Sequence, residues 1–347
     1  MSAAPLRVLV VSALSERWTW LSRHFDPARF RWTFLTCGEG TGRAALMRLS
    51  LRAARAARGH DVVATHGPWT ALFVAAALRA LRVRRPHLAF TFNHGNGIFF
   101  RGPFLALARR VLPATDLFVT HSRHERGLLS RKYGIPVERI AFTHWAVAPP
   151  PQRPAPDYLP QGPFVCCIGR NNRDLPTFIE AVRLARIPAV LICGAGQADG
   201  LDLPPGLVLR SDVPFDECDA VLDRALASVV PLIDDSTGAG HMTVVTSLHY
   251  GTPVIGTQGP ILSDYVIDGE TGLTVPRGSP QALADAIAAL RDDPARRAAL
   301  SGSCRAFAAA HLSQDCAIAF LDKVLARYDP AGNDRSGGPS ARPVTQS

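Results

Sequence analysis

Short runs with strand character alternate with helical segments along the first 148 residues of the chain. The predicted strands are residues 7–11, 32–36, 61–65, 88–92, 117–120 and 140–143. The predicted helices are residues 43–58, 69–81, 104–111 and 123–132. Strand–helix alternation at this spacing is typical of a parallel sheet that is covered by helices on both faces.

The same alternation begins again at residue 164. The predicted strands are residues 164–168, 189–193, 207–209, 228–231 and 253–257, and the predicted helices are residues 175–184, 215–224 and 241–250. Ser279 and Pro280 have the character of an N-cap and a first helical residue, so a helix is expected over 281–291, and another over 314–328. The sequence therefore predicts an α/β protein with two Rossmann-like domains.

A proline-rich segment separates the two patterns. Seven of the fifteen residues from 149 to 163 are proline, which fits neither a helix nor a central strand. A chain of 347 residues also exceeds the size that one hydrophobic core usually serves. We predict domains at 1–148 and 164–328, a linker at 149–163 and a disordered tail at 329–347.

The composition is that of a folded protein without a membrane-spanning helix. Hydrophobic residues make up 47% of the chain, which is enough to build cores, yet no apolar run approaches the roughly 20 residues that a spanning helix needs. The first strand follows the N-terminus without an apolar signal region, and the seven cysteines show no metal-binding spacing. These features predict a cytoplasmic location, buried free thiols and no bound metal.

Positive charge is concentrated in the first half. Residues 1–160 carry 23 Lys and Arg against 8 Asp and Glu, whereas residues 161–347 carry 15 against 21. Two clusters combine arginine with aromatic side chains: Arg79, Arg82, Arg84 and Arg85, and then Arg101, Arg109 and Arg110 with Phe99, Phe100 and Phe104. Such clusters suit an anionic membrane surface, so peripheral association with the inner face of a membrane is expected. A solvated arginine-rich face is the alternative, and no nucleic-acid partner is predicted because no recognised module is present.

In the second half, a loop at residues 169–174 directly follows a predicted strand, where ligands bind in open parallel sheets. It begins with Gly169 and carries Arg170 and Arg173. Guanidinium groups stay charged and offer forked donors to phosphate oxygens, so both arginines are candidate ligands of a diphosphate. An ordinary solvated loop is the alternative interpretation.

A glycine-rich loop leads into the predicted helix at 241–250. Gly238, Gly240 and the amide of His241 would present free N–H groups at a helix start, where the helix dipole favours phosphate. Candidate contacts to a ribose are the hydroxyls of Thr243, Thr246 and Ser247. A glycine-rich turn kept for backbone geometry is the alternative.

Four sequence runs in the second half occur together in a fixed order. They are Gly169-Arg170 with Arg173, Cys193-Gly194-Ala195-Gly196, Gly251-Thr-Pro-Val-Ile-Gly-Thr, and Asp264-Tyr-Val-Ile-Asp-Gly-Glu-Thr-Gly-Leu-Thr-Val-Pro276. These runs resemble the donor-site region of family-4 glycosyltransferases. The resemblance covers most of residues 164–325. In the first half, the runs that end at His66 and at His94-Gly95 are similar to strands that line the acceptor side in such enzymes.

The resemblance implies the GT-B architecture, with two Rossmann-like domains and an interdomain cleft. It also implies transfer of a sugar from a nucleotide-diphosphate donor to a glycan or lipid-linked acceptor with retention of configuration, in polysaccharide or glycolipid synthesis. No cofactor or essential metal is implied, and the chain has no Asp-x-Asp motif. Arg170 and Arg173 would stabilise the leaving diphosphate, and Gly194 would lie at a donor-binding strand end. His94 is the candidate residue on the acceptor side.

Two glutamates that the family usually carries, eight residues apart, are absent. Their places fall at Gly238 and Thr246. A catalytically impaired GT-B pseudoenzyme or sugar-binding partner is therefore the alternative function. An NAD-dependent oxidoreductase is disfavoured because no strand is followed by Gly-x-Gly-x-x-Gly with a later acidic residue.

Overall fold

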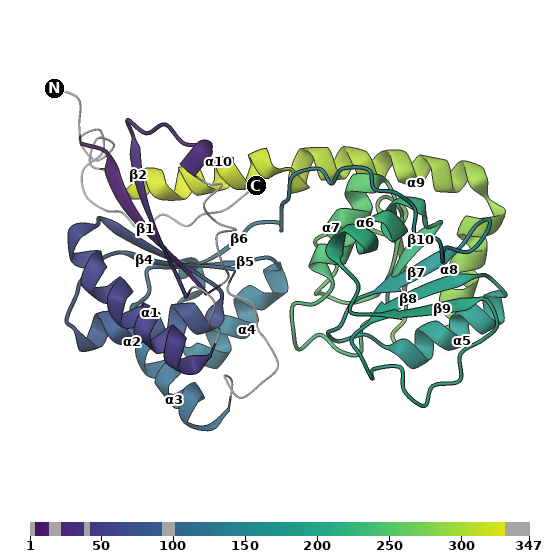
Figure 1. Ribbon diagram of the computed structural model, residues 1–347, viewed down its shortest axis with the longest axis horizontal. Coiled ribbons are helices and arrows are strands. Elements are labelled where there is room, and N and C mark those ends of the chain that lie inside the picture. The colour runs from purple at the N-terminus through teal and green to yellow at the C-terminus, as the bar shows by residue number, and fades with distance from the viewer. Residues whose placement is uncertain (1–3, 14–21, 38–41, 92–100, 330–347) are drawn as a thin grey trace. The chain divides into compact units, whose positions relative to one another are not determined.

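The chain forms two compact units (Figure 1). The structure is a computed structural model and describes residues 4–13, 22–37, 42–91 and 101–329. The first unit combines Met1–Thr143 with Ile318–Ser347, and the second is His144–Ala317. Each unit contains a six-stranded sheet, and the paired strands of the described residues run parallel in both sheets. The predicted class, α/β with two Rossmann-like domains, is confirmed.

The sheet of the first unit has the strand order β2-β1-β3-β4-β5-β6. Its strands are β1 (Leu6–Ser12), β2 (Phe30–Thr36), β3 (Val62–His66), β4 (His87–Phe90), β5 (Leu117–Thr120) and β6 (Ile140–Phe142). The helices that pack on it are α1 (Arg43–Ala56), α2 (Pro68–Ala80), α3 (Gly102–Val111), α4 (Arg123–Tyr133) and the later part of α10 (Gln314–Leu325). From β1 the chain adds β2 on one side of the sheet and then β3 on the other side, so the strand order reverses between β1 and β3. Sheets of this type bind ligands at the carboxyl ends of the two strands at such a reversal.

Alternate residues of the first sheet point to opposite faces and find different partners. Leu9 and Val11 belong to the cluster formed with α1 and α2. Val8 and Val10 belong to the cluster formed with α10, which contributes fully buried Val324. Because both faces of β1 are buried over Val8–Val11, this part of the strand is a continuous apolar run, as the sequence pattern indicated.

The sheet of the second unit has the order β12-β11-β10-β7-β8-β9. Its strands are β7 (Val165–Ile168), β8 (Ala189–Cys193), β9 (Leu207–Ser211), β10 (Ala227–Val230), β11 (Val254–Thr257) and β12 (Gly272–Val275). Its helices are α5 (Leu175–Ala185), α6 (Phe215–Arg224), α7 (His241–Tyr250), α8 (Pro280–Asp292) and α9 (Pro294–Phe307). The order reverses between β7 and β10, which are paired at the centre of the sheet.

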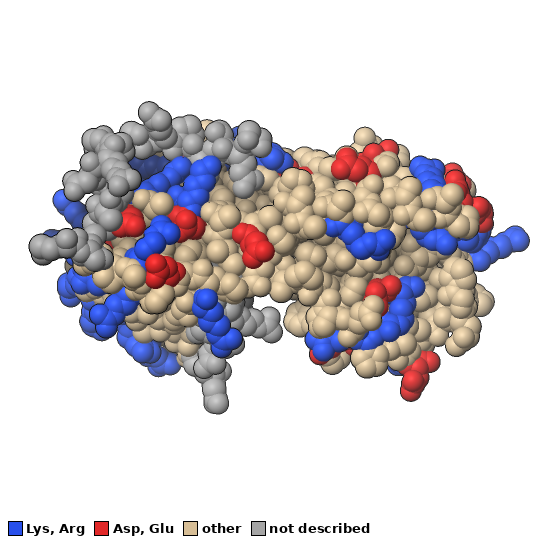
Figure 2. All heavy atoms as spheres, turned by 90° about the horizontal axis from the view of Figure 1, so that it is seen from above, with Lys and Arg blue, Asp and Glu red and all other residues tan. Residues whose placement is uncertain are grey.

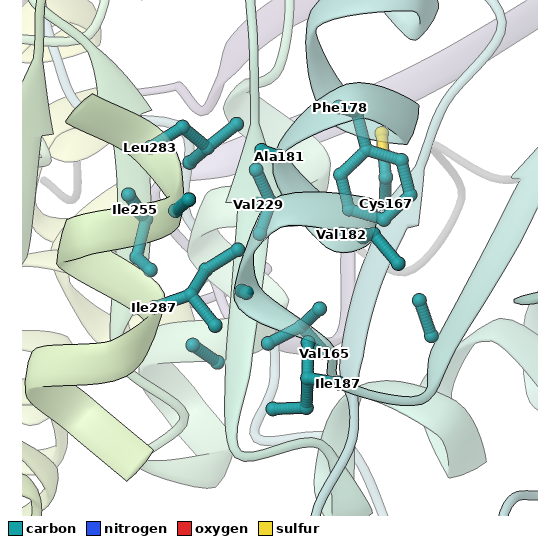
Figure 3. Close-up of a cluster of buried hydrophobic side chains, with 14 of the residues drawn as sticks. Val165, Cys167, Phe178, Ala181, Val182, Ile187, Val229, Ile255, Leu283 and Ile287 are labelled. Carbon is teal, nitrogen blue, oxygen red and sulfur yellow. The ribbon is translucent and has the colours of Figure 1, made fainter. Parts of the chain in front are cut away.

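Helices α5 and α8 cover one face of the second sheet. Phe178 of α5 and Ile287 of α8 are fully buried and converge on Val165 and Val229 of the central strands (Figure 3). The other face packs against α6 near β7 and β8, and against α7 and α9 near β10 and β11. This double coverage fixes the central strands, whose carboxyl ends carry the candidate site.

Two elements of the second unit were not predicted. Strand β12 has four residues and begins at Gly272, where an added Cβ would lie 1.9 Å from the carbonyl oxygen of Val254. Glycine therefore permits the close pairing of β12 with β11. Helix α9 follows α8 after Asp293, which caps it by accepting a hydrogen bond from the amide of Arg296.

The structure divides the chain at other positions than the predicted linker. Residues 149–163 lie in the second unit, where Arg153 pairs with Asp216 at 2.8 Å and the Tyr158 hydroxyl donates to Glu217 at 2.7 Å. Residues 318–328, which were assigned to the second domain, belong to the first unit because the apolar face of α10 completes its core. The predicted tail after residue 329 lies outside the described residues. Among the helices that are described, none has both the length and the apolar character needed to cross a bilayer.

Candidate functional site

The loops that follow β7 and β10 are joined by backbone hydrogen bonds. The amide of Asp174 donates to the carbonyl of Pro231 at 3.0 Å, and Arg173 forms an antiparallel bridge with Leu232. The side-chain amide of Asn172 adds a bond to the carbonyl of Asp234 at 2.8 Å. These contacts hold Arg173 at the reversal of strand order, which is the usual ligand position in doubly wound sheets.

The guanidinium group of Arg173 is held by backbone carbonyls rather than by a carboxylate. Its Nη1 donates to Asn171 O at 3.0 Å and its Nη2 to Ile168 O at 3.1 Å, while its Nε is buried without a hydrogen-bond partner. Within the described part of the chain, no acidic side chain forms an ion pair with it. Burial lowers the pKa of Arg173, but a guanidinium remains protonated at neutral pH. The site therefore carries a positive charge with unfilled bonding capacity.

The absence of a side chain at Gly169 leaves room for the Arg173 side chain. The residue has a φ of 149°, and an added Cβ would lie 2.5 Å from Arg173 Nη2 and 2.7 Å from its Cζ. Those separations are far shorter than a van der Waals contact. The guanidinium thus packs directly on the backbone at the end of β7, and only glycine leaves room for it.

The N-terminus of α7 lies next to this guanidinium. The hydroxyl of Thr243 donates to Ile168 O at 3.1 Å, the same carbonyl that accepts from Arg173. Gly240 occupies the N-cap position with a φ of 93°, no side chain caps the helix, and its first turn has no acidic residue. An uncapped helix start beside a cation without a carboxylate is an anion-binding arrangement.

Arg170 and Gly194, both predicted as donor contacts, have partners within the protein. Arg170 is exposed and pairs with Asp212, beyond the end of β9, at 3.0 Å. The side chain of Gln197 accepts from the amide of Gly194 at 2.8 Å and donates to the carbonyl of Arg170 at 2.6 Å. Gln197 and Asp212 were not singled out from the sequence, because only the fold brings them to these loops.

The other predicted positions on α7 differ in exposure. Ser247 is fully buried and its hydroxyl donates to Thr243 O at 2.7 Å, which leaves it no surface for a ribose. Thr246 and Gly238 are partly exposed, so a ligand at this edge can reach them. Of the predicted set, the structure brings Gly169, Arg173, Gly240 and Thr243 together.

The side chain of His241 belongs to the core rather than to the site. Its Nε2 donates to Ile261 O at 3.1 Å, and its ring centroid lies 4.8 Å from that of Tyr265. Burial lowers the pKa of His241 to about 4, so the ring is neutral at physiological pH. Only its backbone amide, in the first turn of α7, is available to an anion.

In the first unit, His66 lies at the end of β3 and is the register partner of Ser12 at the end of β1. This is the reversal of strand order in the first sheet, and burial lowers the pKa of His66 to about 4. His94 lies outside the described residues, as do Phe99 and Phe100.

The buried side chain of His87 should make the stability of the first unit depend on pH. Its Nε2 lies 2.9 Å from Thr65 Oγ1 and its Nδ1 3.0 Å from Thr115 Oγ1, and burial lowers its pKa to about 3. In the unfolded chain His87 is protonated below about pH 6.5, whereas in the folded chain it stays neutral down to about pH 3. The neutral buried ring therefore contributes its full stability above pH 6.5, and this contribution is lost as the pH falls toward 3. When the pH is lowered from 7.5 to 5.0, we expect the original chain to lose about 2 kcal/mol more unfolding free energy than His87→Asn loses. Urea unfolding at both pH values measures this, and an unchanged loss in the variant would contradict it.

Comparison with solved structures defines the class of fold. HepE from Anabaena, solved in complex with UDP, aligns with a TM-score of 0.71 at 14% identity over 92% of this chain and 99% of that chain. A glycosyltransferase from Rickettsia africae gives 0.71 at 12% identity over 94% and 99%. Sucrose-phosphate synthase from Thermosynechococcus elongatus gives 0.68 at 18% identity over 93% and 98%. The chain therefore has the two-domain, Rossmann-like GT-B fold.

Family models then identify the family. The model described as Glycosyltransferase Family 4 matches residues 8–149, and the model described as Glycosyl transferases group 1 matches residues 162–293. Together the two models cover more than three quarters of the chain. The chain therefore belongs to the family-4 type of glycosyltransferases and is an enzyme of that class. The resemblance seen in the sequence is confirmed. No curated protein sequence matches the chain.

Proposed function

We propose that this glycosyltransferase moves a sugar from a nucleoside-diphosphate donor to a glycan or lipid-linked acceptor, with retention of configuration. The observation that carries the proposal is the Arg173 guanidinium, which has no carboxylate partner among the described residues and lies beside the uncapped start of α7. A diphosphate satisfies both features at once, because it accepts hydrogen bonds from the guanidinium and from backbone amides.

In the proposed reaction, the bond between the anomeric carbon and the diphosphate oxygen breaks while the acceptor hydroxyl forms a bond to the same carbon. The hydroxyl proton passes to the departing diphosphate on the same face of the sugar. Arg173 and the first-turn amides of α7 would stabilise the negative charge that develops on the leaving group, without reorganising during the reaction. Arg170 could add a second contact after releasing Asp212.

A uridine nucleotide is the first donor to test. Structures of HepE, which has the same fold, were solved in complex with UDP and with UDP-glucose. Protein cations at the site would take the role that a metal ion has in other transferases, so we propose that no metal is essential. For the acceptor, we propose that His94 orients the attacking hydroxyl and that the product belongs to polysaccharide or glycolipid synthesis.

The test is a titration of the purified chain with UDP, GDP and ADP, followed by incubation with the corresponding sugar donors with and without a chelator. We expect one diphosphate to bind well above its monophosphate, and the matching donor to release its sugar slowly to water whether or not chelator is present. Binding without any turnover would favour the impaired enzyme that lacks the family's two glutamates. Absence of binding by all three nucleotides would overturn the proposal.

A further inference from the structure

Helix α1 presents an unusual face to solvent. Met47 is 54% exposed and Leu51 is 39% exposed, and they lie one turn apart on the same side of the helix. The arginines exposed on or directly after this helix are Arg43, Arg48, Arg52, Arg55 and Arg58. The helix contains no acidic residue, and its opposite side buries Leu49 and Ala53 against the sheet. The exposed side therefore combines apolar side chains with uncompensated positive charge.

None of these arginines forms an ion pair with a carboxylate of the described residues. The basic surface continues beyond the helix, because Arg85 Nη2 donates to Arg58 O at 3.2 Å and brings the exposed Arg82 and Arg84 to the end of α1. Figure 2 shows several groups of Lys and Arg on the described surface of the first unit, with Asp and Glu between some of them. We call the exposed side of α1, together with Arg58, Arg82 and Arg84, the basic face.

We propose that the basic face docks in the plane of an anionic phospholipid bilayer. Met47 and Leu51 enter the boundary between headgroups and acyl chains, while the flanking arginines contact lipid phosphates. The exposed apolar pair favours a bilayer over a nucleic acid, whose backbone is bound by charge and hydrogen bonding. This proposal rests on the surface of the first unit alone and is independent of the donor site.

The position of this surface differs from the aromatic cluster predicted from the sequence. Phe104, which was expected to face the membrane, makes an edge contact with Trp69 at 5.5 Å and lies beneath the guanidinium of Arg43. Its ring is thus engaged within the protein. Among the described residues, the proposed apolar contribution to docking comes from Met47 and Leu51, which were not predicted from the sequence.

Co-sedimentation of the full chain with lipid vesicles tests the proposal. Vesicles of phosphatidylcholine are compared with vesicles that also contain phosphatidylglycerol. An arginine near an anionic surface contributes roughly fivefold to binding, so the triple variant Arg48→Gln, Arg52→Gln and Arg55→Gln is expected to bind about 100-fold more weakly. The variant Met47→Ala and Leu51→Ala should lose about tenfold. All these residues are exposed and their replacements are good helix formers, so folding should be preserved.

Matched controls come from the second unit. The triple variant Arg186→Gln, Arg210→Gln and Arg296→Gln removes the same charge from exposed positions, and Leu184→Ala removes an exposed leucine. Both controls should bind vesicles within about twofold of the original chain. The proposal would be overturned if the control and test triple variants lost the same vesicle affinity. It would also be overturned if the original chain bound charged and uncharged vesicles equally well, or bound neither. Tighter binding to duplex RNA than to vesicles would overturn it in favour of a nucleic-acid partner. Nucleotide titration of the same variants should be unchanged, which separates this outcome from failure of the donor site.

Discussion

Arg173→Gln is expected to lower kcat for sugar transfer by roughly 10²–10³-fold. Glutamine keeps a polar side chain at this position, but it removes the charge that would stabilise the leaving diphosphate. The loss should appear mainly in kcat, because the negative charge on the diphosphate is larger in the transition state than in the bound donor. Steady-state kinetics with the donor identified by titration measures the change, and circular dichroism checks that the fold persists.

Two further arginines of the second unit serve as controls for this result. Arg170→Gln removes an exposed side chain that already has Asp212 as its partner, so we expect a loss of about tenfold or less. Arg296→Gln, on the exposed side of α9, should leave kcat unchanged. If Arg173→Gln retained a kcat similar to that of Arg296→Gln, the anion site would lie elsewhere and the leaving-group mechanism would be wrong.

The order of elements could be predicted because both units obey local rules. Buried parallel strands are short apolar runs, and the loops after them contain glycine or a helix cap. The predicted strand at 164–168 and helix at 241–250 correspond to β7 and α7, so the loop with Gly169 and the helix start at Gly240 were both placed correctly. Proximity of the two loops followed from the usual ligand position in doubly wound sheets.

What the sequence did not predict depends on contacts between distant residues. The assignment of α10 to the first unit depends on which sheet its apolar side meets, and a helical pattern alone cannot specify that. The burial of Ser247 depends on the rotation of α7 about its axis, and the pairing of Arg170 depends on Asp212 from another loop. Likewise, the basic face became visible only when the structure showed which side of α1 is exposed.

Gly169→Ala is expected to reduce kcat by about 100-fold while leaving every charged side chain in the sequence. An added Cβ would lie 2.5 Å from Arg173 Nη2, so the guanidinium must leave the position in which it faces the start of α7. Misplacing a catalytic group by about 1 Å can cost about that factor. Positive φ adds a backbone cost of about 1–3 kcal/mol, which has to be separated from the effect on Arg173.

Gly200→Ala provides that separation. Gly200 also has a positive φ, at 76°, but an added Cβ there would meet no atom within 4 Å. Both variants should therefore show reduced unfolding free energies by urea denaturation, with the larger reduction in Gly169→Ala because its guanidinium also leaves its hydrogen bonds. Only Gly169→Ala should lose turnover and affinity for the diphosphate. A normal kcat in Gly169→Ala would mean that Arg173 acts equally well from another position. Equal losses of kcat in both variants would mean that backbone strain, and not displacement of the guanidinium, limits the reaction.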